Sequence, residues 1–148
     1  MSLKERIQQD VKDAMRARDK SRLATIRLIT AAIKQREVDE RIELDDAQVL
    51  AVLDKMVKQR RESISQFEKA GRDDLIAQEA GELEIIQTYL PEPLSAEQLA
   101  DLIRSTIAEL GASSIRDMGA VMNALRGQVQ GRADMKAVSQ AVKTQLAS

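Results

Sequence analysis

At Tyr89-Leu90-Pro91-Glu92-Pro93-Leu94-Ser95 the chain carries both of its prolines. Proline lacks the backbone N–H, clashes with the preceding helical turn, and pushes the residue before it out of the helical region. The stretch therefore predicts a firm helix end. Ser95 is a favourable helix N-cap, and Gln98 three residues later completes a capping box. We expect the chain to divide here into a long first part and a short second part.

The composition favours an all-α protein. The 148 residues suit one or two small domains. Hydrophobic residues make up 43% of the chain, yet it has one Phe, one Tyr and no Trp. Its core must be built from aliphatic side chains and Met, which suits helix-on-helix packing, because the aromatic residues that favour strands are nearly missing.

Apolar residues at helical spacing predict four helices before the prolines. We expect them near residues 2–17, from Asp19 or Ser21 to about 39, from Asp45 or Asp46 to about 70, and from Asp73 or Asp74 to the prolines. Gly71 is expected to end the third helix in the left-handed conformation. Gly81, inside the fourth, costs about 1 kcal/mol relative to Ala and is compatible with close packing there.

Three shorter helices are predicted after the prolines. They cover about 96–110 with Gly111 as the stop, a segment capped by Ser114 and Asp117 that ends before Gly127, and 135–147 with Asp134 as the cap. We therefore predict an all-α fold with a four-helix N-terminal domain at residues 1–90, a Pro-containing linker at 91–95, and a three-helix C-terminal bundle at 96–148.

The net charge of −1 hides strong segregation along the chain. Residues 1–36 and 55–72 carry +6 and +4, whereas 37–54 and 73–94 each carry −6. Such blocks can pair between neighbouring antiparallel helices, and we weight this interpretation above a binding role. Arg60 falls within an apolar face, so we expect it to pair with a carboxylate between domains or to extend its head to water.

A basic row is predicted on the second helix, where Lys20, Arg27, Lys34 and Arg41 recur every seven residues. They drift only about 20° per step around a helix, so they share one side. The row is either an ordinary solvated face or a track for phosphates, and we weight the solvated face more heavily. Lys58 and Arg61 are expected to add to a positive surface.

Several kinds of catalytic site are excluded by residue type. The chain has no Cys and no His, so Ser-His and Cys-His nucleophile systems are absent. It also lacks a phosphate-binding GxxxxGK[ST] loop. Acidic pairs such as Glu79 with Glu82 are better explained as hydrated helix faces. We expect no cofactor and no metal.

The chain is expected to be cytoplasmic. No apolar run approaches the ~20 residues of a membrane span. The residues after Met1 are charged and do not form the apolar segment of a signal peptide. We therefore expect no membrane partner.

An ordered set of motifs resembles the YqeY-like family (GatB/YqeY domain). The matching segments, in chain order, are Ile26–Lys34 with Glu37-Val38, Lys58–Ser63, Phe67–Arg72, Tyr89–Pro91, Asp117–Met122 and Gly131–Asp134. Each segment alone is weakly specific, whereas the ordered set covers essentially the whole chain. Met135 is a departure, because the family often has Gly there.

The resemblance implies a four-helix region followed by a three-helix tail. The same module is similar to the C-terminal region of the B subunit of glutamine-dependent aminoacyl-tRNA amidotransferase, where it helps to hold the tRNA. It implies a non-catalytic accessory protein for tRNA or another structured RNA. The candidate phosphate-binding residues are Arg27, Lys34, Lys58, Arg61, Arg126, Arg132 and Lys136.

Two other functions remain open. The first is a protein-interaction adaptor that docks on an amidotransferase, a synthetase or another partner through an exposed helix face. The second is a carbon–nitrogen ligase with glutamine as the amide donor, assigned by similarity to the parent enzyme. We give the enzyme the lowest weight, because the required nucleophile and nucleotide-binding residue types are missing.

Overall fold

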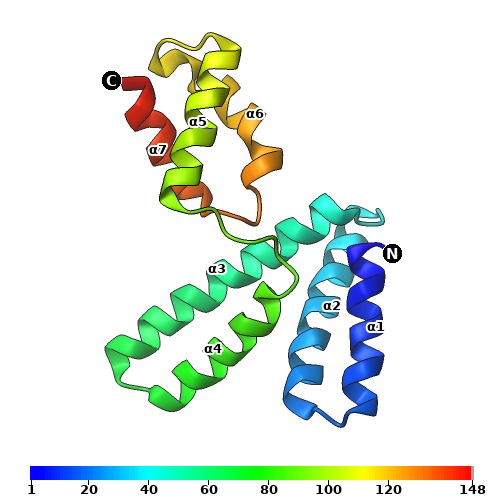
Figure 1. Cartoon of the computed structure of the whole chain (residues 1–148). Coiled ribbons are helices and arrows are strands. Elements are labelled where there is room, and N and C mark those ends of the chain that lie inside the picture. Colours follow the sequence, from blue (N-terminus) through cyan, green and yellow to red (C-terminus); the bar gives the residue numbers. More distant parts are fainter. Residues whose placement is uncertain (148) are drawn as a thin grey trace. The chain divides into compact units, whose positions relative to one another are not determined.

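The computed structural model describes residues 1–147, and it is all-helical over that range. It contains seven α-helices and one short 3-10 helix, with no strand among the described residues, which confirms the predicted all-α class (Figure 1). The contacts within the chain group into two compact units, residues 1–90 and the residues from Pro91 onward. We call them the first and the second unit and describe each by itself.

The first unit consists of two helical hairpins. Its helices are α1 (Leu3–Arg16), α2 (Lys20–Glu40), α3 (Asp46–Ala70) and α4 (Asp73–Gln87). The most extensive contacts in this unit join α3 to α4 and α1 to α2. Side-chain oxygens of Ser2, Asp19 and Asp45 each accept a backbone N–H from the first turn of the helix that follows. These caps satisfy donors that would otherwise lack a partner, so they fix where the first three helices begin.

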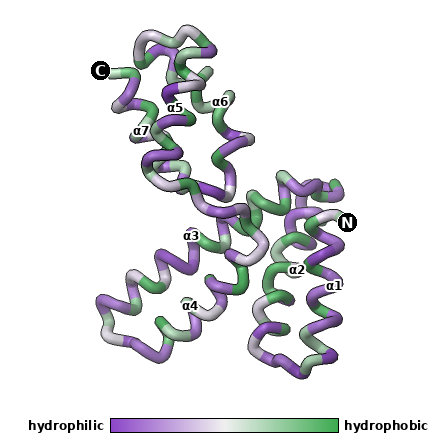
Figure 2. The backbone as a smooth tube through the Cα atoms, viewed as in Figure 1, coloured by the Kyte–Doolittle hydropathy of each residue, from purple (hydrophilic) through white to green (hydrophobic). Residues whose placement is uncertain are grey.

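The core of the first unit is aliphatic. Its least exposed side chains come from all four helices, and examples are Ile7, Ile29, Leu53 and Ile86, each 0% exposed. The core ends at Val57 on α3 and at Ile86 on α4, because residues 58–85 contain no fully buried side chain. The outer half of the α3–α4 hairpin is therefore a thin two-helix arm, and the turn at its end is hydrophilic (Figure 2).

The second unit is a set of three helices with its own core. It comprises α5 (Ala96–Leu110), a 3-10 turn (Ile115–Asp117), α6 (Met118–Val129) and α7 (Met135–Ala147). Its core residues are Ile103, Val121, Leu125, Val129, Val138, Val142 and Leu146, and Leu94 packs against them. None of these residues belongs to the core of the first unit.

Most predicted helix ends are confirmed. Ser95 and Gln98 form both hydrogen bonds of the capping box, and Gly71 and Gly111 end α3 and α5 with φ of 69° and 65°. Gly127 as a stop is wrong, because α6 continues to Val129. The chain turns instead at Gly131, where φ is 76°. A left-handed backbone is cheap only for glycine, which explains the position of this turn.

The predicted packing role of Gly81 is wrong as well. A Cβ added to this residue of α4 would meet no other atom within 4 Å. We therefore expect Gly81→Ala to raise the free energy of unfolding by about 0.5–1 kcal/mol, because Ala has the higher helix propensity. Chemical denaturation would measure the change, with Gly71→Ala as the matched control. Gly71 has a positive φ, so that variant should be destabilised, and a loss of stability in Gly81→Ala would contradict the prediction.

Candidate nucleic-acid interface

Oppositely charged blocks of the sequence pair between helices of the first unit. Lys4 of α1 lies 2.7 Å from Glu37 of α2, and Arg60 of α3 lies 3.4 Å from Glu82 and 3.9 Å from Glu79 of α4. This confirms, for these pairs, the interpretation of the segregated charges as partners of one another. The partners of Arg60 lie within the first unit, so the alternative of a carboxylate between domains is wrong.

Arg60 is expected to hold the two helices of the arm together. Its side chain is 15% exposed, and Glu82 is 16% exposed. Removing one partner leaves the other charge partly buried, so Arg60→Ala should lower the free energy of unfolding by about 1–3 kcal/mol. Arg60→Met should cost less than Arg60→Ala, because it keeps the apolar stem, but it should still destabilise, because it leaves the same carboxylates without their partner. Urea denaturation measures both, with Arg61→Ala on the exposed side of α3 as control; equal losses at Arg60 and Arg61 would contradict the assignment.

Arg27 and Lys34 lie on the α1 side of α2. Both are exposed, and the guanidinium of Arg27 lies 4.0 Å from the sulfur of Met15 on α1. Lys34 faces Glu37, whose pKa is held below its usual range by the hydrogen bond from Lys4, by the N–H of Leu44, and by the charges of Lys4 and Lys34. Glu37 is therefore ionised at neutral pH and offsets part of the positive charge of this surface.

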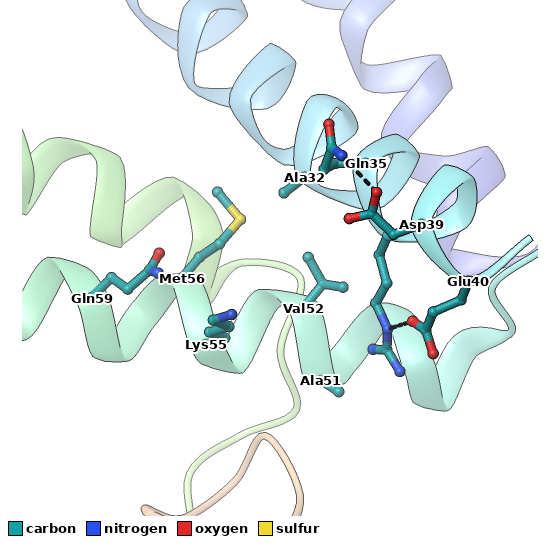
Figure 3. Close-up of a pocket in the computed structure, with 10 residues that line it drawn as sticks. Ala32, Gln35, Asp39, Glu40, Ala51, Val52, Lys55, Met56 and Gln59 are labelled. Carbon is teal, nitrogen blue, oxygen red and sulfur yellow. Dashed lines mark hydrogen bonds and ion pairs between the residues drawn. The ribbon is translucent and has the colours of Figure 1, made fainter.

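Lys58 and Arg61 lie elsewhere on the first unit. They are exposed on α3, three and six residues beyond Lys55. Lys55 lines a groove of about 650 Å³ between α2 and α3, whose α2 wall includes Ala32 and Arg36 (Figure 3). Lys34 is two residues from each of these, which places it about 160° around α2. The groove, and with it Lys55, therefore lies on the opposite side of α2 from Arg27 and Lys34.

The candidates of the second unit gather at the connection from α6 to α7. Arg126 and Lys136 are exposed at the two ends of this connection. Arg132 is half-buried, and its Nε donates to the carbonyl oxygen of Glu92 at 3.0 Å. Its own carbonyl oxygen accepts the N–H of Leu94 at 2.8 Å. Arg132 therefore fixes residues 92–94 to the second unit, a structural role that sequence reasoning missed because the partners are 40 residues apart.

Residues 1–147 contain neither a membrane-spanning helix nor a cluster of metal ligands. No helix in this range combines the length and the apolarity needed to cross a bilayer. No three or more Asp and Glu side chains of the described part are grouped so that they could hold a metal ion.

Comparison with known proteins identifies a family. A family model described as Yqey-like protein matches residues 4–146. A relative from Eremothecium gossypii, "Altered inheritance of mitochondria protein 41, mitochondrial", is 43% identical over 107 residues, which is 70% of this chain and 58% of that protein. A protein of the same name from Pyrenophora tritici-repentis is 30% identical over 141 residues, which is 93% of this chain and 77% of that protein.

These relatives correct the predicted compartment. Their names describe mitochondrial proteins, and this finding contradicts the prediction of a cytoplasmic protein. The matches to the relatives from Eremothecium gossypii and Kluyveromyces lactis span 58% and 45% of those proteins, so the chain covers about half the length of such relatives.

Proposed function

Because the chain belongs to the YqeY-like family, we propose that it is a non-catalytic accessory protein that binds tRNA or another structured RNA. The surface that we assign to phosphate contact is the connection between α6 and α7, with Arg126 and Lys136 as the contacting residues. Arg27 and Lys34 on α2, and Lys58 and Arg61 on α3, would be additional contacts. Lysine and arginine on helices hold phosphates without reading bases, which agrees with the near absence of aromatic side chains for base stacking.

The observation that carries this proposal is the placement of exposed positive charge on rigid elements. Arg126 is on α6 and Lys136 is in the first turn of α7, while Arg132 is held between them by the hydrogen bond to Glu92. The helices fix the backbone positions of Arg126 and Lys136, so only their side chains have to be ordered when they meet a phosphate. The acidic residue nearest in sequence, Asp134, is exposed and lies between the two, so binding should be modest and sensitive to salt.

We expect Arg126→Gln with Lys136→Gln to weaken the binding of tRNA several-fold. Each lost phosphate contact should also reduce the slope of log K against log salt by about one. The measurement is fluorescence anisotropy with labelled tRNA from about 50 to 200 mM salt. We leave Arg132 unchanged in this variant, because its replacement would also release residues 92–94.

The matched control is Lys143→Gln, which removes one exposed charge from the same helix as Lys136. This control should leave the slope unchanged. An equal loss per removed charge in the control and in the double variant would show that only net charge matters, and it would refute the assigned surface. Binding no stronger than that of an unrelated acidic protein at about 50 mM salt would refute the RNA proposal itself.

The alternative activity, transfer of the amide nitrogen of glutamine, has a direct test. The purified chain would be incubated with glutamine, and the release of ammonia would be measured. Release above that of a heat-denatured sample would overturn the non-catalytic assignment.

We also propose that the two units are independently stable domains, four helices followed by three. The separate aliphatic cores support this proposal, because each unit buries its own apolar side chains. The hydrogen bonds between Arg132 and residues 92–94 make the connection between the two units shorter than the linker at 91–95 that the two prolines suggest. Leu90 packs against the first core and Leu94 against the second, so we place the joint at Pro91 and its neighbours.

A further inference from the structure

Helix α2 has a second apolar face that no part of the first unit covers. Leu28 is 45% exposed and Val38 is 63% exposed, and Ala24 and Ala31 are exposed as well. At 100° per residue these four positions fall within an arc of about 80°, which also contains the exposed Lys20 and Gln35. We call them the outer face of α2. Ile29 and Ile33, which are buried in the core, lie on the opposite side of the helix. A helix that faces one core normally has a polar outer surface, so a second apolar face indicates a second contact.

The surroundings of the outer face are asymmetric. On one side is the α2–α3 groove, which is lined by the carboxylates of Asp39 and Glu40 as well as by apolar residues. Val52 and Met56 extend into it from α3 toward α2 (Figure 3). On the other side are Arg27 and Lys34, both exposed, while Lys20 has the same angular position as Val38. The surface thus presents apolar side chains between a groove and a line of positive charge.

We propose that the outer face of α2 binds an amphipathic helix of a partner protein that carries carboxylates along one edge. The apolar side of this helix packs on Leu28 and Val38, with its larger side chains directed into the α2–α3 groove. Its carboxylates face Arg27 and Lys34. The distance from Ala24 to Val38 is about 21 Å along α2, which matches a partner helix of about four turns.

Charge complementarity favours this occupant over an antiparallel second copy of the chain. An antiparallel pair of α2 helices would set Lys20, Arg27 and Lys34 against the same row of the other copy. Like charges at such positions are destabilising. The apolar part of this face is unsuited to RNA, because a phosphate gains nothing from contact with Leu28 or Val38. The partner helix would therefore compete with RNA for Arg27 and Lys34 only. A helix with acidic residues on one edge satisfies both the apolar face and the basic row.

Two synthetic peptides of 16 residues would test the proposal. Both have leucines at i, i+3, i+4 and i+7, and they differ along one edge, which carries glutamates in the first and lysines in the second. Their binding to the full chain would be measured by fluorescence anisotropy. We expect the glutamate peptide to bind at least about tenfold more tightly than the lysine peptide, and the difference to shrink at high salt.

Variants of the outer face should remove this binding. We expect Leu28→Gln with Val38→Gln to weaken the binding of the glutamate peptide by at least about tenfold. Glutamine keeps the helix propensity and removes the apolar contact. The matched control is Leu110→Gln with Ile115→Gln, since these residues of the second unit are 48% and 47% exposed. This control should leave peptide binding unchanged, and far-UV circular dichroism verifies that each variant is folded.

Several results would overturn the proposal. The first is equal binding of the two peptides, or no binding of either up to about 1 mM. A second is a dimer in sedimentation experiments that the Leu28→Gln and Val38→Gln variant abolishes, because the occupant would then be another copy of the chain. A third is the loss of tRNA binding in the same variant, which would assign the outer face to the RNA surface.

Discussion

Leu53→Ala is expected to lower the melting transition of the first unit and leave that of the second unit unchanged, and Leu125→Ala is expected to do the reverse. Each leucine is 0% exposed, and each belongs to a different core. A Leu→Ala change at such a site costs about 2–5 kcal/mol, because the transferred apolar surface is lost and a cavity remains. If the two units are separate domains, this loss is confined to the unit that contains the substitution.

The sequence itself offers a probe that separates the two transitions. Phe67 and Tyr89 are the only aromatic residues of the chain, and both belong to the first unit. Tyrosine fluorescence therefore reports on the first unit, whereas far-UV circular dichroism reports on the helices of both. Leu125→Ala should shift part of the dichroism transition and leave the fluorescence transition in place.

Exposed leucines serve as the control for this experiment. Leu28→Ala and Leu110→Ala remove the same atoms from sites that are 45% and 48% exposed, so each should change stability by less than about 0.5 kcal/mol. A single transition that both core variants shift equally, by fluorescence and by dichroism, would refute independent domains.

Short-range chemistry explains why much of the fold could be predicted from the sequence. A capping box such as Ser95 with Gln98 lies within four residues, and its two hydrogen bonds are seen in the structure. Gly71 and Gly111 end their helices because the left-handed conformation needed there favours glycine. Gly127 gave a false signal, since a glycine inside a helix costs stability without ending the helix.

The candidate site was harder to predict, because it depends on distant contacts. Periodicity showed that Lys20, Arg27 and Lys34 share one side of α2, but it could not show that Lys55 and the groove lie on the other side. Nor could it distinguish which apolar side of α2 is buried. Ile29 is in the core and Leu28 is exposed, although both are large aliphatic residues in the same helix. Only the packing of the other helices separates them.

Tyr89→Ala is expected to lower the free energy of unfolding of the first unit by about 3–5 kcal/mol, the range for removal of a large buried aromatic side chain. The Tyr89 ring is 4% exposed, and its hydroxyl donates a hydrogen bond to Asp10 of α1. The guanidinium of Arg6 lies 5.0 Å from the centre of the ring. Tyr89 therefore attaches the segment after α4 to α1.

Tyr89→Phe separates the hydroxyl from the ring. We expect a loss of about 1.5 kcal/mol, the lower end for a hydrogen bond to a charged group, because Asp10 is partly exposed and also lies near Arg22. In a double-mutant cycle, Asp10→Asn should have less effect in the Phe background than in the wild type. Additive effects would show that the hydrogen bond contributes nothing.

The pH dependence gives a second, independent test of this contact. Burial and the hydrogen bond to Asp10 raise the pKa of Tyr89 above its usual value of 10.0. The unfolded chain therefore releases this proton at lower pH than the folded chain does, so the stabilisation is complete below pH 10 and declines as the pH rises further. The Phe variant has no such proton, and the stability advantage of the wild type over it should shrink above pH 10. If the stability difference between the wild type and Tyr89→Phe stays constant from pH 7 to 11, the hydroxyl of Tyr89 does not hold the chain in the first unit immediately before Pro91.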